Sequence, residues 1–166
     1  MIRVILPVIA VLPLLAGCGD DPDNVPVYGQ WELTRTLDSV TIDGVLLSPD
    51  QLPAEFRAME GAESRCGEPL YTDADWQAKD VSQRTGGQCE LTDYTHDEAR
   101  AELAGQCTLS EGGVSYRPKM RGRSTFDAAT TRDVVTMEGS LKLPGDDSPH
   151  VLKVIAVQEG KRIGDC

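Results

Sequence analysis

The chain has 166 residues, with 16 basic and 27 acidic side chains and a formal net charge of −11. Because this acidic excess repels the phosphate backbone, the composition excludes nucleic acid as an expected partner. Once a predicted signal segment of residues 1–17 is removed, 149 residues remain, which is the size of one domain with its own core.

The N-terminal segment has the pattern of an exported lipoprotein. A short charged start is followed by an apolar run over Val4–Leu15, which is too short to span a bilayer and is typical of a signal-peptide core. The next residues, Leu15-Ala16-Gly17-Cys18, resemble a bacterial lipobox. We therefore expect cleavage after Gly17 and a lipid on Cys18. The alternative is an ordinary secretory signal with an unrelated cysteine.

Residues 18–27 are rich in Pro and Asp and lack apolar periodicity, which predicts a flexible tether between the lipid and the domain. The lipid on Cys18 makes a membrane the first expected partner. Gly19 follows this cysteine, where an Asp would resemble the inner-membrane retention signal of enteric lipoproteins. That difference favours the periplasmic face of the outer membrane, with the inner membrane as the less favoured alternative.

Four cysteines remain after Cys18. They are Cys66, Cys89, Cys107 and Cys166. An even number in an oxidising compartment predicts two disulfides, and the residues leave all three pairings open. A zinc site is the rival hypothesis, but there is no Cys-x-x-Cys pair and His96 and His150 lack ligand spacing. We therefore expect no metal and no cofactor.

The first half of the domain alternates between strand and helix signals. Trp31, Leu33, Arg35 and Leu37 alternate with polar residues, which predicts a half-buried strand that continues or pairs through Asp43-Gly44. Residues 49–60 carry helix-start signals and an apolar i, i+4, i+7 face, and predict a short helix. A second helix is predicted from Thr72 to the glycines at 86 and 87.

Residues 97–104 present a conflict between two structures. Their composition, with a capping box at Thr95 and Glu98, favours a helix. An antiparallel hairpin with its turn near Glu98 would instead place Cys89 opposite Cys107, and would put Leu91 and Leu103 on the face of the two cysteines. We predict the hairpin.

Three further strands are predicted after the hairpin, over residues 114–126, 135–143 and 151–157. Pro118 cannot donate to a ladder and indicates an edge or a bulge. The last run is apolar on both faces and fits a central strand. The predicted fold of residues 28–166 is a single mainly β (α+β) domain: an antiparallel sheet forming a barrel or half-barrel, with two short helices and two disulfides.

The order of the cysteines and the terminal sequence Arg162-Ile163-Gly164-Asp165-Cys166, together with the lipobox and Gly29-x-Trp31-Glu32, resemble one family. This is the domain of unknown function 3617 family of small exported Gram-negative lipoproteins. The resemblance implies disulfides between Cys89 and Cys107 and between Cys66 and Cys166. It implies no biochemical activity. The chain departs from the family in the insertion before Cys66, which includes the predicted helix at 49–60.

Four cations form the candidate binding residues. On one face of the strand over 114–126 lie Arg117, Lys119, Arg121 and Arg123. Alternate residues of a strand lie about 6.6 Å apart, so the four charges would form a row that suits an anionic lipid, an anionic glycan or an acidic envelope protein. The alternative is an ordinary solvated face, paired across strands with neighbours such as Asp133 and Glu138.

The leading functional hypothesis is a lipid-anchored envelope interaction module without catalysis. The second is a small lipophile or lipid carrier, since a barrel interior would be lined by apolar residues, although side chains of this size also pack solid. These residues are Trp31, Leu33, Tyr116, Met120, Phe126 and Met137. A hydrolase is third, because Ser110, His150 and the many carboxylates match no catalytic motif. No catalytic residue and no oligomeric state are predicted.

Overall fold

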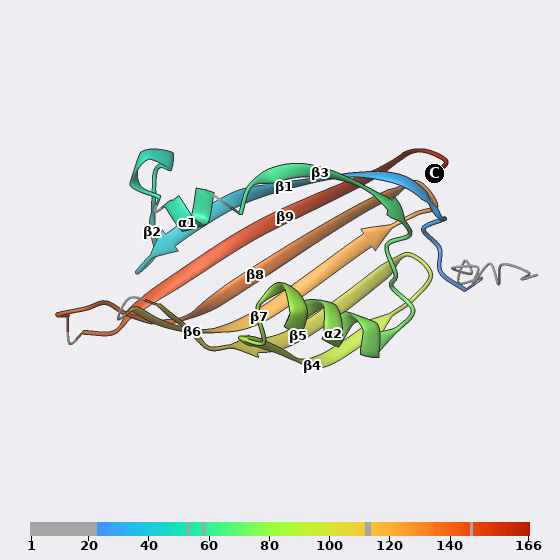
Figure 1. The fold of residues 1–166 in the computed structure, drawn as a ribbon. Helices are drawn as coiled ribbons and strands as arrows, with labels where there is room; N and C mark the ends of the chain where they lie inside the picture. Colours follow the sequence, from blue (N-terminus) through green and yellow to red (C-terminus); the bar gives the residue numbers. More distant parts are fainter. Residues whose placement is uncertain (1–22, 53, 58, 112–113, 147) are drawn as a thin grey trace, which may run out of the picture.

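The computed structural model describes residues 23–166, apart from residues 53, 58, 112, 113 and 147. Nine described strands form one antiparallel sheet in the order β2-β1-β9-β8-β7-β5-β4, with β3 also paired to β1 and β6 to β7 (Figure 1). Within this described part, β4 at one edge does not pair with β2 or β3 at the other. The predicted antiparallel β fold is confirmed, and the closed barrel is wrong because the sheet stays open.

Four long strands make the body of the sheet: β1 (Gly29–Ile42), β7 (Val114–Phe126), β8 (Thr130–Lys142) and β9 (His150–Gly164). The shorter strands are β2 (Val45–Leu46), β3 (Gly61–Gly67), β4 (Cys89–His96), β5 (Arg100–Cys107) and β6 (Leu109–Glu111). The helical segments are η1 (Pro49–Gln51, a 3-10 turn), α1 (Ala54–Arg57) and α2 (Ala74–Arg84).

The sheet has two chemically different faces. The inner face is the one that packs against α2, and it carries buried residues such as Leu33, Met120 and Val154. The outer face carries the alternate residues, such as Glu32 and Lys119, which are exposed. The period of two that predicts the strands in the sequence therefore also separates the two faces. As predicted, the C-terminal strand β9 is central, between β1 and β8.

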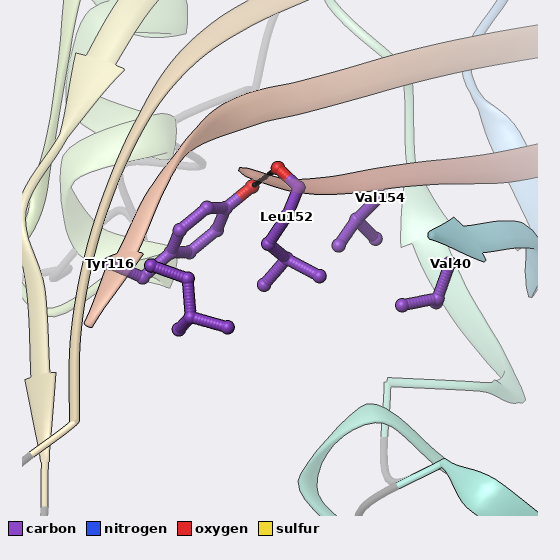
Figure 2. Close-up of a cluster of buried hydrophobic side chains, with 5 residues drawn as sticks. Val40, Tyr116, Leu152 and Val154 are labelled. Atoms are coloured by element: carbon purple, nitrogen blue, oxygen red, sulfur yellow. Dashed lines mark hydrogen bonds between the residues drawn. The ribbon is translucent and has the colours of Figure 1, made fainter. Parts of the chain in front are cut away.

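A packed core lies on the inner face, at the end of the long strands where β1 turns back into β2. Val40, Tyr116, Leu152 and Val154 pack together there (Figure 2). The Tyr116 hydroxyl donates to the carbonyl of Leu152 at 3.2 Å, so this buried polar group has a partner. Burial also raises the pKa of Tyr116, which keeps the phenol protonated as a donor.

The predicted helix over residues 49–60 is wrong in its extent. The structure has the 3-10 turn η1 and the single-turn helix α1, so α2 is the one described helix longer than four residues. The capping interaction does form, since Gln51 Oε1 accepts from the Ser48 amide at 2.9 Å. The helix stops because Leu52 is extended, with φ −70° and ψ 128°. A proline follows Leu52 in the sequence and disfavours the helical conformation of the preceding residue.

The second predicted helix is confirmed as α2. Asp73 Oδ1 caps it by accepting from the Trp76 amide at 2.9 Å. At its other end Gly86 and Gly87 adopt φ of 60° and 78°, which ends the helix as the two glycines predict. Val81 packs on the cluster that contains Cys89 and Met120, so α2 lies against the inner face (Figure 1).

The hairpin over β4 and β5 is also confirmed, and the helical alternative for residues 97–104 is wrong. Cys89 pairs with Cys107 in the register. Asp97 Oδ1 accepts from the amides of Ala99 and Arg100, both at 2.8 Å, and this Asp-centred turn competes with a helix start. Leu91 and Leu103 pack on the cysteine cluster, as expected.

Pro118 differs from its prediction, since it lies in the middle of a central strand. It is tolerated because the neighbour of β7 changes there: Lys119 pairs with Gln106 of β5 and Tyr116 pairs with Leu109 of β6. No ladder donor is required between these two partners. On the other side Gly139 lies opposite Pro118, and a Cβ on this glycine would come within 2.1 Å of the Arg117 carbonyl.

Both predicted disulfides are present. Cys89–Cys107 closes the β4–β5 hairpin, and Cys66–Cys166 joins β3 to the end of the chain across 100 residues. The sequence gives no signal for β3 itself, because its residues Gly61–Gly67 lack apolar alternation. This strand pairs with β1 along seven residues.

The predicted signal segment 1–17 and the lipidation site Cys18 lie outside the described residues. Residues 24–27, expected to belong to the tether, pack against the domain: Asn24 is buried and donates to the Pro69 carbonyl at 2.9 Å, and the Val27 amide donates to Ala128. The folded part therefore begins earlier than Tyr28. Within the described ranges no helix is long and apolar enough to cross a membrane.

Candidate functional site

The four predicted binding cations lie together on the outer face, along β7. Arg117, Lys119, Arg121 and Arg123 are all exposed. Arg123 pairs with Glu102 of β5 at 2.8 Å, and both side chains remain more than half exposed. Among the described residues, no acidic side chain lies within ion-pair distance of the other three cations.

The cross-strand pairs expected for these cations do not form as proposed. Glu138 is on the outer face but pairs with Lys153 of β9, at 3.3 Å. Asp133 lies on the inner face, because it is opposite Ser124 and not opposite a cation of β7. The structure thus separates Asp133 from the cations and brings it into a different site.

That site is a cavity of about 340 Å³ between the inner face and α2, which we call the α2 cavity. Trp76 and Val81 of α2 contribute to one wall, and the inner face forms the floor. Of the residues expected to line a barrel interior, Leu33, Met120 and Met137 line the α2 cavity. Trp31, Tyr116 and Phe126, which are also buried, do not line the α2 cavity.

Five residues in register across five strands make an apolar row on the floor of the α2 cavity. They are Leu37, Ala156, Val135, Gly122 and Leu103. Ala156, in the middle part of this row, has a small side chain that leaves space under α2. A Cβ on Gly122 would lie only 2.7 Å from Leu103 Cγ, so Leu103 already occupies the space over this glycine.

A polar row runs beside the apolar row, two residues away along each strand. In register across β1, β9, β8 and β7 lie Arg35, Gln158, Asp133 and Ser124, all of which line the α2 cavity. Because neighbouring strands are about 4.8 Å apart, the polar row spans roughly 14 Å. An apolar surface and a line of hydrogen-bonding groups therefore share one cavity floor.

Asp133 is held by two donors. The Tyr71 hydroxyl donates to its Oδ1 at 2.9 Å, and Gln158 Nε2 donates to its Oδ2 at 3.3 Å. Tyr71 is positioned by stacking on Phe126, with ring centroids 4.1 Å apart. Burial, followed by the charge of Asp133, raises the pKa of Tyr71, so its hydroxyl stays a donor.

A second tyrosine extends this network. The Tyr94 hydroxyl donates to the carbonyl of Tyr71 at 2.8 Å. Burial, with the charge of Asp133 as the second cause, raises the pKa of Tyr94 to about 12. Both phenols therefore remain protonated at neutral pH, and Asp133 is the acidic residue of the polar row.

Arg35 is the charged group at the other end of the polar row. Its Nη2 donates to Glu63 of β3 at 3.0 Å, in a pair whose side chains are about two-fifths exposed. The Nε of Arg35 is buried and has no hydrogen-bond partner among the described residues. This guanidinium therefore has donors that the described protein groups do not use.

The polar row was missed by sequence reasoning, although a signal is present. Arg35 stands in phase with Trp31, Leu33 and Leu37, at a position where the alternation calls for an inward apolar side chain. Asp133 likewise stands in phase with Val135. A charged residue at an inward position of a strand is uncommon and indicates a paired or functional group.

Among the described residues, Ser110 and His150 do not assemble into a hydrolase site. His150 Nδ1 lies 2.7 Å from Asp43 and its Nε2 lies 2.9 Å from Asp146, so both ring nitrogens contact carboxylates. Within the described chain no serine or cysteine hydrogen-bonds to this ring. No group of three or more His, Cys, Asp or Glu side chains among the described residues is placed to hold a metal ion.

Comparisons with known proteins identify a family and no relative of known activity. Neither the curated proteins nor the solved structures include a significant match. A family model described as "Protein of unknown function (DUF3617)" matches residues 25–166, which include all nine strands and both disulfides. The resemblance carried by the cysteines and the terminal sequence is thereby confirmed, and the chain belongs to the DUF3617 family.

Proposed function

We propose that this protein is a lipid-anchored envelope protein that binds a small, mainly apolar ligand in the α2 cavity without catalysing a reaction. The anchor and the location rest on the lipobox at Cys18. The sequence alone favours an interaction module, and the α2 cavity is the observation that supports ligand binding ahead of it.

The size and lining of the α2 cavity support this proposal. Ligand sites in proteins are clefts of about 300–1,000 Å³ with mostly apolar walls and a few placed polar groups. The α2 cavity has about 340 Å³, with the apolar row and the polar row side by side on its floor. A solid core exists elsewhere on the same face, around Val154, so this space under α2 is a local feature.

Native mass spectrometry of residues 23–166, purified from the periplasm without reduction, tests the proposal. These residues contain the whole sheet and both disulfides. We expect a noncovalent adduct, which Ala156→Phe abolishes because the ring fills the floor of the α2 cavity. The matched control is Ile155→Phe, on the opposite face of the same strand, which retains the adduct.

Circular dichroism and the melting temperature of both variants establish that each is folded. A bare wild-type protein that also fails to take up added amphiphiles would overturn the proposal. Equal loss of the adduct in both variants would also overturn it, because the ligand would then not reside over Ala156.

A second function, docking to anionic phospholipid headgroups through the outer face, is supported by the three cations that lack an acidic partner among the described residues. They are Arg117, Lys119 and Arg121. A lipid on Cys18 would hold the domain near such headgroups. Cosedimentation of residues 23–166 with phosphatidylglycerol vesicles tests this, with phosphatidylcholine vesicles as the uncharged comparison.

We expect binding to phosphatidylglycerol vesicles that weakens with salt and is lost in Arg117→Glu/Arg121→Glu. The control Arg57→Glu/Lys79→Glu makes the same charge change away from the outer face, on α1 and α2. Equal binding by both double variants would remove the outer face as the docking surface.

A further inference from the structure

We infer that the ligand of the α2 cavity is a single-chain amphiphile with an anionic head group, such as a carboxylate, which Arg35 binds while the chain lies on the apolar row. This inference rests on the proposed function and names the chemistry of its ligand. Arg35 and Asp133 of the polar row differ in how much of their hydrogen-bonding capacity is already used.

The acidic end of the polar row is already occupied. Both carboxylate oxygens of Asp133 accept hydrogen bonds, from Tyr71 at 2.9 Å and from Gln158 at 3.3 Å. A cationic head group would have to displace one of these donors. Displacement of a charge-assisted hydrogen bond is costly, so this end of the polar row does not call for a further partner.

Arg35, at the basic end of the polar row, has N–H groups that no described residue accepts. Arg35 has five N–H groups, and among the described residues it donates only one hydrogen bond, to Glu63. Arg65 of β3 also lines the α2 cavity, and no described acidic side chain lies within ion-pair distance of it. Arg35 pairs with Glu63, and Arg65 has no acidic partner among the described residues, so this end of the polar row has two guanidinium groups and one paired carboxylate.

The surroundings of Arg35 leave room for a head group. In the register of β1 and β3, Arg35 lies opposite Gly61, and a Cβ on this glycine would meet nothing within 4 Å. Asp133 is two strands away from Arg35, which is about 10 Å between backbones, so its repulsion of an anion is weak beside a direct contact with Arg35. Asp80 of α2 is the other aspartate that lines the α2 cavity.

The apolar row gives the chain of the amphiphile its direction. From Arg35 the next inward residue along β1 is Leu37, the first member of the apolar row. Beyond the row the floor continues to Met120 and Met137, whose unbranched side chains adapt to a ligand. A head group on Arg35 therefore places an alkyl chain over apolar side chains.

Calorimetric titration of residues 23–166 with three matched probes tests the inference: decanoate, decanol and decyltrimethylammonium. We expect decanoate to bind about tenfold or more tightly than decanol, since its carboxylate gains charge-assisted hydrogen bonds to the guanidinium. Decyltrimethylammonium should bind most weakly of the three.

The variant Arg35→Gln should remove the preference for decanoate and leave the affinity for decanol unchanged. Arg132→Gln is the matched control, because Arg132 also pairs with a glutamate of a neighbouring strand, Glu159 at 3.3 Å, but on the outer face. Arg35→Lys keeps the charge and should retain part of the preference for decanoate. This variant tests the inference if the glutamine variant fails to fold.

The outcomes separate the two proposals. If decanol or the cation binds as well as decanoate, or if Arg132→Gln has the same effect as Arg35→Gln, the assignment of an anionic head group is wrong and ligand binding stands. If none of the three probes binds to a folded protein, the proposed function fails as well.

Discussion

The inner and outer faces of the sheet are made by alternate residues of the same strands, yet the two faces depend on different interactions. On the inner face, Trp31 is fully buried and Tyr71 is held between an aromatic ring and a carboxylate. On the outer face, Arg123 and Glu102 form an ion pair in which both side chains stay largely in water. Adjacent residues in the sequence should therefore differ severalfold in what their side chains contribute to stability.

The largest expected effect is at Trp31. The variant Trp31→Ala should lower the free energy of unfolding by about 3–5 kcal/mol, because it removes a fully buried ring whose Nε1 donates to the Val27 carbonyl. Urea denaturation of the oxidised protein measures this change. Glu32→Ala, one residue away on the outer face, is the control and should change it by less than about 0.5 kcal/mol. Similar losses in both would contradict the assignment of the faces.

A smaller effect is expected at Tyr71. The variant Tyr71→Phe keeps the stacking on Phe126 and removes the hydrogen bond to Asp133. Hydrogen bonds to charged groups contribute about 1.5–3 kcal/mol, and we expect a loss of this size in urea denaturation.

The matched control for this hydroxyl is Tyr28→Phe, since the Tyr28 hydroxyl lies 3.2 Å from Cys66 Sγ at an exposed position. Its stability should change by less than about 0.5 kcal/mol. If Tyr71→Phe and Tyr28→Phe lower the free energy of unfolding equally, the hydrogen bond from Tyr71 to Asp133 does not stabilise the fold as expected.

The outer face should show a still smaller effect. Arg123→Gln removes the ion pair with Glu102, whose side chains are 70% and 58% exposed. Exposed pairs contribute about 0.2–1 kcal/mol and are screened by salt, so we expect a change below 1 kcal/mol that disappears at high ionic strength. A loss as large as that of Tyr71→Phe would show that the two faces do not differ as described.

The most local effect is expected at His150, where a loop meets β9. Hydrogen bonds to Asp146 and then Asp43 raise the pKa of His150, and the hydrogen bond to His150 lowers the pKa of each carboxyl. The contact is therefore fully formed between about pH 4 and 6.5, weakens as pH rises through the raised pKa of His150, and is lost as pH falls through the lowered pKa values of the aspartates.

NMR titration of the His150 ring checks this pH dependence. The midpoint should lie above the ordinary value of about 6.5, and Asp146→Asn and Asp43→Asn should each lower it. A midpoint unchanged by either substitution would mean that the two carboxylates do not contact the ring in solution.

Much of the fold is predictable from the sequence because period-two alternation is a local signal. It identifies β1, β7 and β8, a run that is apolar on both faces identifies β9, and the spacing of Cys89 and Cys107 decides for the hairpin against strong helix formers. The strand β3 is not predictable in this way, since its residues have no apolar alternation and it forms only because β1 offers it an edge. Closure of the sheet is likewise decided by pairing between distant strands.

The site is less predictable than the fold. Arg35 and Asp133 each break an apolar alternation, which marks them as unusual from the sequence. Only the register across β1, β9 and β8 brings them into one polar row, and this register depends on non-local pairing. The cations of β7 are identified correctly as exposed, but their partners are not, because Asp133 lies on the opposite face.

The pairing of β1 with β9 has a consequence for the order in which the protein folds. The ribosome makes β1 first and β9 last, and these strands pair from Gln30↔Gly164 to Ile42↔Leu152. The first long strand therefore cannot pair with β9 until the last long strand has been made. Contacts between residues this far apart in the sequence make folding slow. The sheet cannot be completed until β9 has been made, and a truncation that removes β9 would leave both β1 and β8 without their shared neighbour.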